Sequence, residues 1–141
     1  MNFIDLFSGI GGFALAITTI VSGSQNVAHT EIDEYACNVY HKQFPNSVCL
    51  GDIKEVNWKP YENRINLICG GFPCQPHSTA GKRLASKDER NLWDECRRAL
   101  REIRPDYALF ENVPGIITSE KGTFFQKVLC DIVFGYPADL F

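Results

Sequence analysis

The chain has 141 residues, of which 45% are hydrophobic and 22% are charged, and its formal net charge is −3. This composition is typical of one soluble globular domain, and it excludes a collagen-like or disordered chain. The acidic balance argues against a surface that binds nucleic acid everywhere, but it leaves a local basic site open. No apolar run reaches the roughly 20 residues of a membrane span, and the start MNFIDLFSGIGG lacks the basic segment of a signal peptide. We therefore expect a cytoplasmic protein without membrane contacts.

The chain has six cysteines. Five lie within segments typical of helices or strands rather than in the loops of a disulfide-bonded secreted protein. We interpret these five as small buried thiols: Cys37, Cys49, Cys69, Cys96 and Cys130. A zinc site formed by Cys69, Cys74 and His77 is the alternative, but the chain has no C-x-x-C pair, and we expect no metal.

The first half of the chain predicts three strands that alternate with two helices. In chain order these are a strand over 2–7, a glycine run over 8–12, a helix over 13–21 stopped by Gly23, a strand over 27–31, a helix over 34–43 and a short strand over 48–50. Asp33 is placed to cap the second helix, and Pro45 ends it. The glycine run therefore joins a strand to a helix.

The second half continues the alternation. Residues 65–69 are almost continuously apolar, as expected of a parallel strand covered on both faces. After a polar stretch over 75–90, apolar residues recur at helical spacing at Leu92, Cys96, Ala99, Leu100 and Ile103, and Pro105 ends this helix. A strand over 106–110 follows, and then a last helix that carries Phe125, Val128, Leu129 and Ile132 and ends at Gly135.

Strands that alternate with helices predict stacked β-α-β units. The fold class is therefore α/β, a Rossmann-like doubly wound and mostly parallel sheet with helices on both faces. Ligands of such sheets bind at the carboxyl ends of the strands. Polar or special residues follow all five predicted strands: Ser8 to Gly12, then Glu31, then Asp52, then Pro73 and Cys74, and last Glu111 and Asn112. We expect the functional site at this edge.

The glycine run and Glu31 together indicate an adenosine-containing cofactor. Glycines after a strand are by themselves as typical of a tight turn as of a ligand cradle. However, an acidic residue at the end of the second strand can accept the hydroxyl groups of a ribose. Asp52 is placed to bond an adenine amino group, or it belongs to a plain Gly-Asp turn.

Cys74 stands between Pro73 and Pro76, which stiffen the backbone around it. It is either an inert buried thiol or a nucleophile, and its place after a strand favours the nucleophile. Glu111 is either a solvated charge or a carboxylate that shares a substrate with Cys74. The loop after Cys74 has a positive excess of two, which favours phosphate contact over a merely solvated loop.

Six segments, in this order, resemble the N-terminal motifs of DNA (cytosine-5) methyltransferases. They are DLFSGIGGF (5–13), EIDEYACNVYHKQFP (31–45), GDI (51–53), GGFPCQPHS (70–78), DERNLWDE (88–95) and ENVPG (111–115). His77 replaces the aromatic residue that is more usual in this family. The resemblance implies a fold of the S-adenosylmethionine-dependent methyltransferase type and an enzyme of bacterial restriction-modification that is nucleoid-associated.

The resemblance also implies roles for individual residues. Cys74 would add as a thiolate to carbon 6 of cytosine, and Glu111 would hold the ring through N3 and the exocyclic amine. The cofactor, S-adenosyl-L-methionine, with S-adenosyl-L-homocysteine as its product, would contact Phe7, Ser8, Gly9, Ile10, Gly11, Glu31, Ile32, Asp52, Ile53, Pro73 and Leu92. The substrate, double-stranded DNA with a flipped cytosine, would contact Phe72, Gln75, Ser78, Lys82, Arg83 and Asn112.

Proteins of this family are considerably longer than 141 residues. We therefore expect 1–141 to be the truncated N-terminal portion of the cofactor-binding and catalytic domain, without a target-recognition domain. Such a chain is expected to be inactive unless a separate chain supplies the C-terminal motifs. The alternatives are a cofactor-binding remnant without catalysis, a cytosine methyltransferase that acts on RNA, and a nucleotide-dependent oxidoreductase, which would leave Pro73-Cys74-Gln75 unexplained.

Overall fold

The computed structural model describes residues 1–73 and 86–134. Its strands are β1 (Asn2–Leu6), β2 (Gln25–His29), β3 (Val48–Cys49), β4 (Leu67–Gly71) and β5 (Tyr107–Glu111), all parallel and in the order β3-β2-β1-β4-β5. Its α-helices are α1 (Gly12–Ile20), α2 (Glu34–Gln43), α3 (Ser86–Ile103) and α4 (Thr123–Phe134). Short 3-10 helices are η1 (Ile53–Glu55), η2 (Lys59–Tyr61), η3 (Pro114–Ile117) and η4 (Ser119–Gly122). The predicted α/β Rossmann-like sheet is confirmed.

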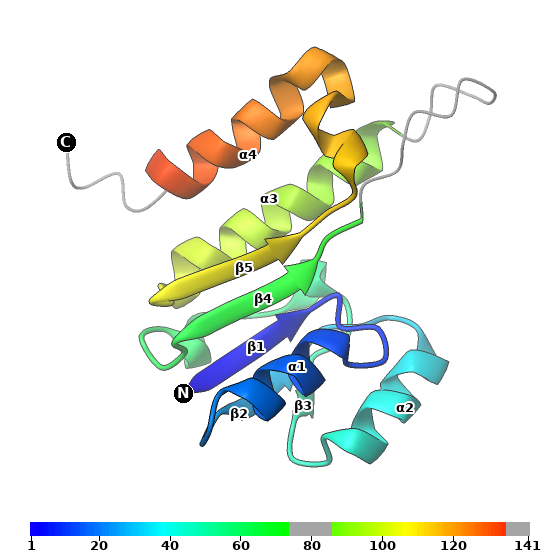
Figure 1. Cartoon of the computed structure of the whole chain (residues 1–141), viewed down its shortest axis with the longest axis vertical. Helices are drawn as coiled ribbons and strands as arrows, with labels where there is room; N and C mark the ends of the chain where they lie inside the picture. The colour runs from blue at the N-terminus through cyan, green and yellow to red at the C-terminus, as the bar shows by residue number, and fades with distance from the viewer. Residues whose placement is uncertain (74–85, 135–141) are drawn as a thin grey trace.

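The strand order reverses next to β1. The chain runs outward from β1 to β2 and β3 and then crosses to β4 on the other side of β1. Because parallel crossovers are right-handed, the reversal places α1 and α2 on one face of the sheet and α3 on the other (Figure 1). Ligands of such sheets bind where the strand order reverses, here between the carboxyl ends of β1 and β4.

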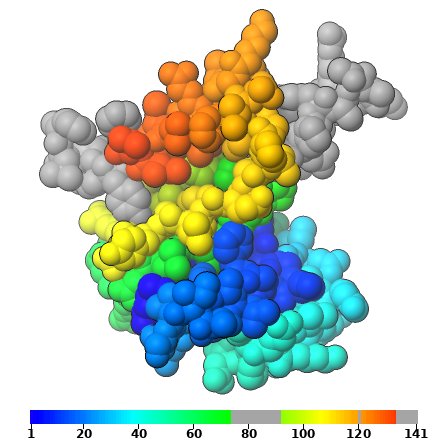
Figure 2. All heavy atoms as spheres, viewed as in Figure 1, coloured from blue at the N-terminus to red at the C-terminus, as the bar shows by residue number. Residues whose placement is uncertain are grey.

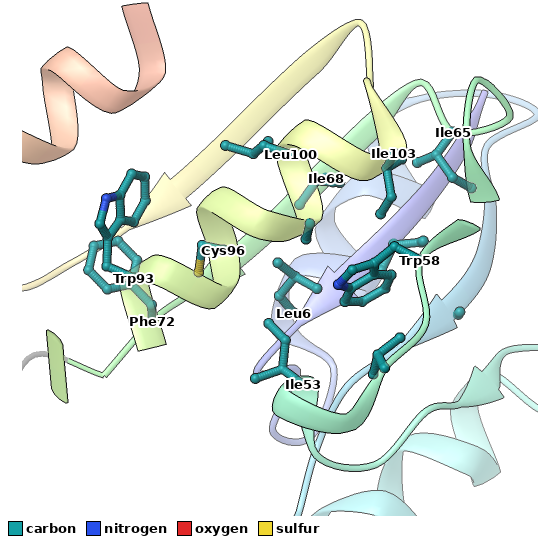
Figure 3. Close-up of a cluster of buried hydrophobic side chains, with 14 of the residues drawn as sticks. Leu6, Ile53, Trp58, Ile65, Ile68, Phe72, Trp93, Cys96, Leu100 and Ile103 are labelled. Carbon is teal, nitrogen blue, oxygen red and sulfur yellow. The ribbon is translucent and has the colours of Figure 1, made fainter. Parts of the chain in front are cut away.

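Alternate residues of the strands build two hydrophobic clusters, one on each face. Phe3, Leu67 and Cys69 face α1 and α2, where they pack with Ala14, Ile17 and Tyr40. The larger cluster contains Ile4, Leu6 and Ile68 and packs against α3 and the segment before β4. Figure 3 shows Trp58 and Trp93 in this second cluster, and both side chains are fully buried.

Helix α2 has the predicted bounds, because its start signal is local. Asp33 accepts a hydrogen bond from the backbone N–H of Ala36 over 2.8 Å, which confirms the predicted cap. The strands differ from their predicted bounds by one or two residues. β1 and β3 each end one residue earlier than predicted, and β5 is shifted by one residue. The differences are largest for β2, which covers Gln25–His29 rather than 27–31, and for β4, which covers Leu67–Gly71 rather than 65–69. Helix α3 begins at Ser86, so residues 86–90 are helical and not part of a polar loop.

In the observed register, β4 places Gly70 against β1. A side chain at Gly70 would place its Cβ 2.5 Å from the carbonyl oxygen of Leu6 and 2.9 Å from the Leu6 Cβ. No real Cβ approaches a backbone oxygen so closely, so only glycine allows the two strands to pair here.

The prediction of five buried thiols is wrong for three of them. Cys69 and Cys96 are buried, but Cys37 is half-buried, and Cys49 and Cys130 are exposed. Cys49 is exposed because its strand, β3, has only two residues and lies at the edge of the sheet.

One face of β5 is uncovered by the described part of the chain. Tyr107 and Leu109 pair with Leu67 and Cys69 and so share the face that α1 covers elsewhere, yet they are 69% and 47% exposed. Figure 2 shows the side chains of β5 at the surface between α1 and α4. No helix among the described residues is both long and apolar enough to span a membrane.

Candidate active site

The loop after β1 is held in a strained shape by Thr30. Phe7 and Gly9 have positive φ angles of 51° and 52°, which place them in the left-handed region. The backbone N–H of Phe7 donates to Thr30 Oγ1 over 3.0 Å, and that of Ser8 donates to the Thr30 carbonyl over 2.9 Å. Thr30 therefore fixes the glycine loop, a role that the sequence analysis missed, although Thr30 directly precedes Glu31.

Gly11 closes this loop against α2. Its φ angle is 97°, and a Cβ there would lie 2.9 Å from Phe44 Cε2 and 3.2 Å from the Tyr40 ring. By contrast, a Cβ at Gly9 would meet nothing within 4 Å. The loop is therefore packed on its inner side and open at Gly9.

Glu31 is oriented by three backbone donors. Its Oε2 accepts from the N–H of Gly9 over 2.8 Å, and its Oε1 accepts from Ile32 and Asp33 over 2.8 and 2.9 Å. A carboxylate offers about four lone-pair sites, so this arrangement leaves acceptor capacity for a ligand hydroxyl. Ile32 is 78% exposed and offers an apolar surface beside the carboxylate.

The segment after β3 contains two predicted cofactor contacts, the polar Asp52 and the buried Ile53. Asp52 Oδ1 accepts from the backbone N–H of Lys54 over 3.0 Å and so caps η1. Ile53 is only 3% exposed and belongs to the core. The side chain of Ile53 therefore does not face a cofactor, as its predicted adenine contact would need, and only its backbone is left for such a contact.

The end of β4 leads to the predicted nucleophile. Phe72 packs its ring 5.1 Å from Trp93 and 6.1 Å from Phe110, so its side chain lies in the core rather than toward a substrate. The side-chain amide of Asn112 donates to the Phe72 carbonyl over 2.7 Å. Asn112 thus fixes the backbone two residues before Cys74.

Five predicted site residues lie outside the described residues: Cys74, Gln75, Ser78, Lys82 and Arg83. Of the neighbouring predicted residues, Pro73 is exposed at the end of this segment, and Leu92 is half-buried against the larger core cluster.

Glu111 ends β5 beside β4. It pairs in register with Gly71, and its Oε2 lies 3.1 Å from the position that a Gly71 Cβ would occupy. The carboxylate therefore lies over Gly71, three residues before Cys74, in space that a side chain at Gly71 would take.

A buried polar cluster lies beneath the glycine loop. Asp5 accepts a hydrogen bond from the Tyr40 hydroxyl over 3.2 Å and from the Cys69 thiol over 3.6 Å, and burial raises the pKa of Asp5 to about 7. His29 stacks on the Tyr40 ring at 3.9 Å and contacts Ser47 Oγ through Nδ1 at 2.9 Å. Burial lowers the pKa of His29 to about 4.

The strand ends bring most of the described candidates to one edge of the sheet. The glycine loop, Glu31 and Asp52 follow β1, β2 and β3, and Phe72 and Glu111 follow or end β4 and β5. A cleft of about 540 Å³ lies elsewhere, lined by residues 24–27 and 43–48, at the amino end of β2. We assign the site to the carboxyl edge because polar groups converge there, whereas the cleft lies at the opposite end of β2.

Comparison with known sequences gives one consistent result. The family model of the C-5 cytosine-specific DNA methylases matches residues 1–136. The type II methyltransferase M.Eco47II of Escherichia coli is 39% identical over 127 residues, which cover 89% of this chain and 30% of the relative. M.HhaI of Haemophilus parahaemolyticus is 36% identical over 129 residues, 91% of this chain and 38% of the relative. The chain thus spans about a third of the length of these relatives.

Two solved structures share the fold of this chain over more than 90% of its length. A prophage-encoded DNA modification methyltransferase of Escherichia coli superposes with a TM-score of 0.76 at 28% identity, over 94% of this chain and 38% of the other. Spodoptera frugiperda DNMT2 superposes with a TM-score of 0.71 at 28% identity, over 92% of this chain and 40% of the other. The chain belongs to the C-5 cytosine-specific DNA methylase family.

Proposed function

We propose that this chain provides the cofactor-binding edge and the nucleophile of an enzyme that methylates carbon 5 of cytosine in DNA. The observation that carries the proposal is the bond between Gly9 and Glu31, which joins the glycine loop after β1 to an oriented carboxylate after the neighbouring strand β2. The family match over residues 1–136 supports it.

The residues at the edge fit an adenosine-containing cofactor. Glu31 keeps acceptor capacity for a ribose hydroxyl, and Gly9 leaves its outer side open. Ser8 Oγ is buried and has no hydrogen-bond partner among the described residues. Ile10 in the glycine loop and Ile32 next to Glu31 have exposed apolar side chains that a ligand could cover. S-adenosylmethionine, when bound, would supply the methyl group.

The proposed chemistry begins at Cys74. Its thiolate forms a bond to carbon 6 of cytosine, which makes carbon 5 electron-rich enough to accept a methyl group. Glu111 shares a proton with ring N3, which offsets the negative charge that builds there, and accepts a hydrogen bond from the exocyclic amine. Once carbon 5 carries the methyl group, its proton is lost to solvent, the carbon 6–sulfur bond breaks to regenerate the Cys74 thiolate, and the ring becomes aromatic again. Asn112 acts as a positioning residue, because it holds the Phe72 carbonyl.

The proposed substrate is double-stranded DNA, and the proposed setting is bacterial restriction-modification. Relatives named type II methyltransferases support this choice. The reaction needs the cytosine outside the duplex, since carbon 6 is not accessible within the stack. Because the chain spans 30% to 38% of these relatives, we propose that activity also needs the C-terminal motifs, on the same or a separate chain.

Methyl transfer from labelled S-adenosylmethionine tests the proposal. The 141-residue chain should be assayed alone and with a chain that carries the C-terminal motifs, on mixed DNA and on mixed RNA. We expect label in DNA only when both chains are present, and none with Cys74→Ser. Cys130→Ser is the matched control, because Cys130 is an exposed thiol on α4, and it should keep full activity. Transfer that persists in Cys74→Ser, or that occurs only to RNA, would contradict the proposal.

A further inference from the structure

Two cysteines from different elements meet beside the candidate site. Cys37 on α2 and Cys49 at the end of β3 place their sulfur atoms 3.8 Å apart. Cys37 is half-buried, and Cys49 is exposed. The distance is that of two sulfur atoms in contact, whereas a disulfide bond measures about 2.05 Å. Oxidation therefore needs the sulfur atoms to approach by about 1.8 Å, the difference between these distances.

The surrounding structure allows this approach. Strand β3 has two residues, lies at the edge of the sheet, and contacts only β2 within it. The sulfur atoms would approach by rotation about the Cα–Cβ bonds and a small shift of this edge, where β3 pairs with one strand at two positions.

The two thiols differ in reactivity. Solvent reaches Cys49, which makes it the entry point for a small oxidant. Burial, and then the neighbouring Cys49, raise the pKa of Cys37 to about 11, and its thiol donates to the Glu31 carbonyl over 3.6 Å. Cys37 is therefore the slower thiol, placed to resolve an oxidised Cys49.

We propose that Cys37 and Cys49 form a reversible disulfide that ties α2 to β3 when the protein meets a peroxide. The Cys49 thiolate attacks one peroxide oxygen, the O–O bond breaks, and Cys49 becomes a sulfenic acid as hydroxide leaves. Cys37 loses its proton to solvent and attacks the Cys49 sulfur, the S–O bond breaks, and a second hydroxide leaves. Two thiols and one hydrogen peroxide thus give one disulfide and two waters, and a dithiol reductant reverses the reaction.

The disulfide would also act on the candidate cofactor site, and this step rests on the proposed function. Closing the bond removes the hydrogen that Cys37 donates to the Glu31 carbonyl and draws the Cys37 side chain toward β3. The same residue, Glu31, holds the glycine loop through Gly9. Oxidation should therefore weaken the binding of S-adenosylhomocysteine several-fold.

Peptide mass spectrometry tests the disulfide directly. The chain should carry Cys74→Ser and Cys130→Ser, so that Cys37 and Cys49 are the thiols under test, and it should be treated with dilute hydrogen peroxide and then alkylated. We expect one linked pair of peptides, joined through Cys37 and Cys49 with the loss of two hydrogens, and its disappearance on treatment with dithiothreitol. Cys49 oxidised to sulfinic acid or linked to another chain, without this pair, would overturn the proposal.

Two further measurements keep the two steps separate. In the same Cys74→Ser, Cys130→Ser chain, Cys37→Ser should leave Cys49 as a sulfenic acid that dimedone labels, whereas the chain that keeps Cys37 should show no such label; equal labelling would contradict the resolving role. In this Cys74→Ser, Cys130→Ser chain, S-adenosylhomocysteine should bind the oxidised form several-fold more weakly than the reduced form, and peroxide should not change its binding once Cys49→Ser is added. Unchanged affinity after complete disulfide formation would overturn the regulatory step alone. Absence of binding to the reduced chain would count against the proposed function instead.

Discussion

The backbone N–H of Gly9 donates to Oε2 of Glu31 over 2.8 Å, across 22 positions of the sequence. This bond fixes the glycine loop against the end of β2 in the ligand-free chain. A site whose parts are already joined loses little freedom when a ligand binds, so more of the contact energy remains as affinity.

Replacing Glu31 should therefore weaken cofactor binding. We expect Glu31→Ala to reduce the binding free energy of S-adenosylhomocysteine by about 1 to 3 kcal/mol, the cost of losing hydrogen bonds to a charged group. Isothermal titration calorimetry measures this change. Glu34→Ala is the matched control, because Glu34 is exposed in the first turn of α2, and it should bind like the parent chain. Equal affinity of Glu31→Ala and the parent would remove Glu31 from the site.

Gly70 and Gly12 should respond in opposite ways to alanine. Gly70→Ala places a Cβ 2.5 Å from the Leu6 carbonyl oxygen, so β1 and β4 must separate. We expect a loss of about 2 to 3 kcal/mol in the free energy of unfolding, as for other overpacked interiors. Gly12→Ala meets nothing within 4 Å in the first turn of α1 and should be neutral or slightly stabilising. Urea unfolding measures the free energy of unfolding of both variants. Similar stability for the two would show that the strands accommodate the methyl group.

Arg98 should stabilise the segment between β3 and β4. Its guanidinium donates to the carbonyls of Val56 and Ile53 over 2.9 and 2.7 Å and thereby joins α3 to η1. Arg98→Ala leaves both carbonyls without this donor, and we expect a loss of about 2 kcal/mol in the free energy of unfolding. Arg101→Ala, at an exposed position of the same helix, should change it by less than about 0.5 kcal/mol. A chemical denaturation series compares the two, and equal midpoints would contradict this role of Arg98.

Asp5 should make stability depend on pH. Burial raises the pKa of this carboxyl from its ordinary 3.8 to about 7, against the lowering effect of the Tyr40 and Cys69 hydrogen bonds. The folded chain therefore holds the Asp5 proton more tightly than the unfolded chain does. The resulting stabilisation is complete below pH 3.8 and is lost as the pH rises through 7, by up to about 4 kcal/mol.

His29 acts in the opposite direction, so Asp5 must be tested by difference. Burial lowers the pKa of His29 to about 4, and stability from this group is gained as the pH rises from 4 to its ordinary 6.5. The contribution of His29 to the pH dependence of stability cancels when the parent chain is compared with Asp5→Asn. Urea unfolding between about pH 4 and pH 8 should show the parent losing stability relative to Asp5→Asn with rising pH. Parallel curves for the two proteins would mean that Asp5 titrates normally.

Local signals in the sequence were enough to predict much of the fold. Helix α2 was predicted with its bounds because Asp33 caps its start and Pro45 follows its end. The polar residues at the strand ends were predicted to share one edge because parallel strands place their carboxyl ends together, and the strand order confirms the parallel sheet on which this prediction depends.

Features that depend on register or on distant contacts were missed. The two bonds from Thr30 to the glycine loop arise only because β1 and β2 pair as they do. Arg98 reaches carbonyls 42 and 45 residues away, and no sequence pattern marks such a contact. Cys49 looked like a buried thiol, and only the position of β3 at the sheet edge shows it to be exposed.

Amide NMR with S-adenosylhomocysteine tests the central claim, that the cofactor binds at the carboxyl edge of the sheet. In the 141-residue chain labelled with nitrogen-15, the amide signals of Gly9, Gly11, Ile32 and Ile53 should shift with increasing ligand, and those of Asn26 and Asn46 at the opposite cleft should not. In Glu31→Ala the same shifts should need higher ligand concentrations. Shifts confined to residues 24–27 and 43–48, or no shifts at saturating ligand, would contradict the assigned site.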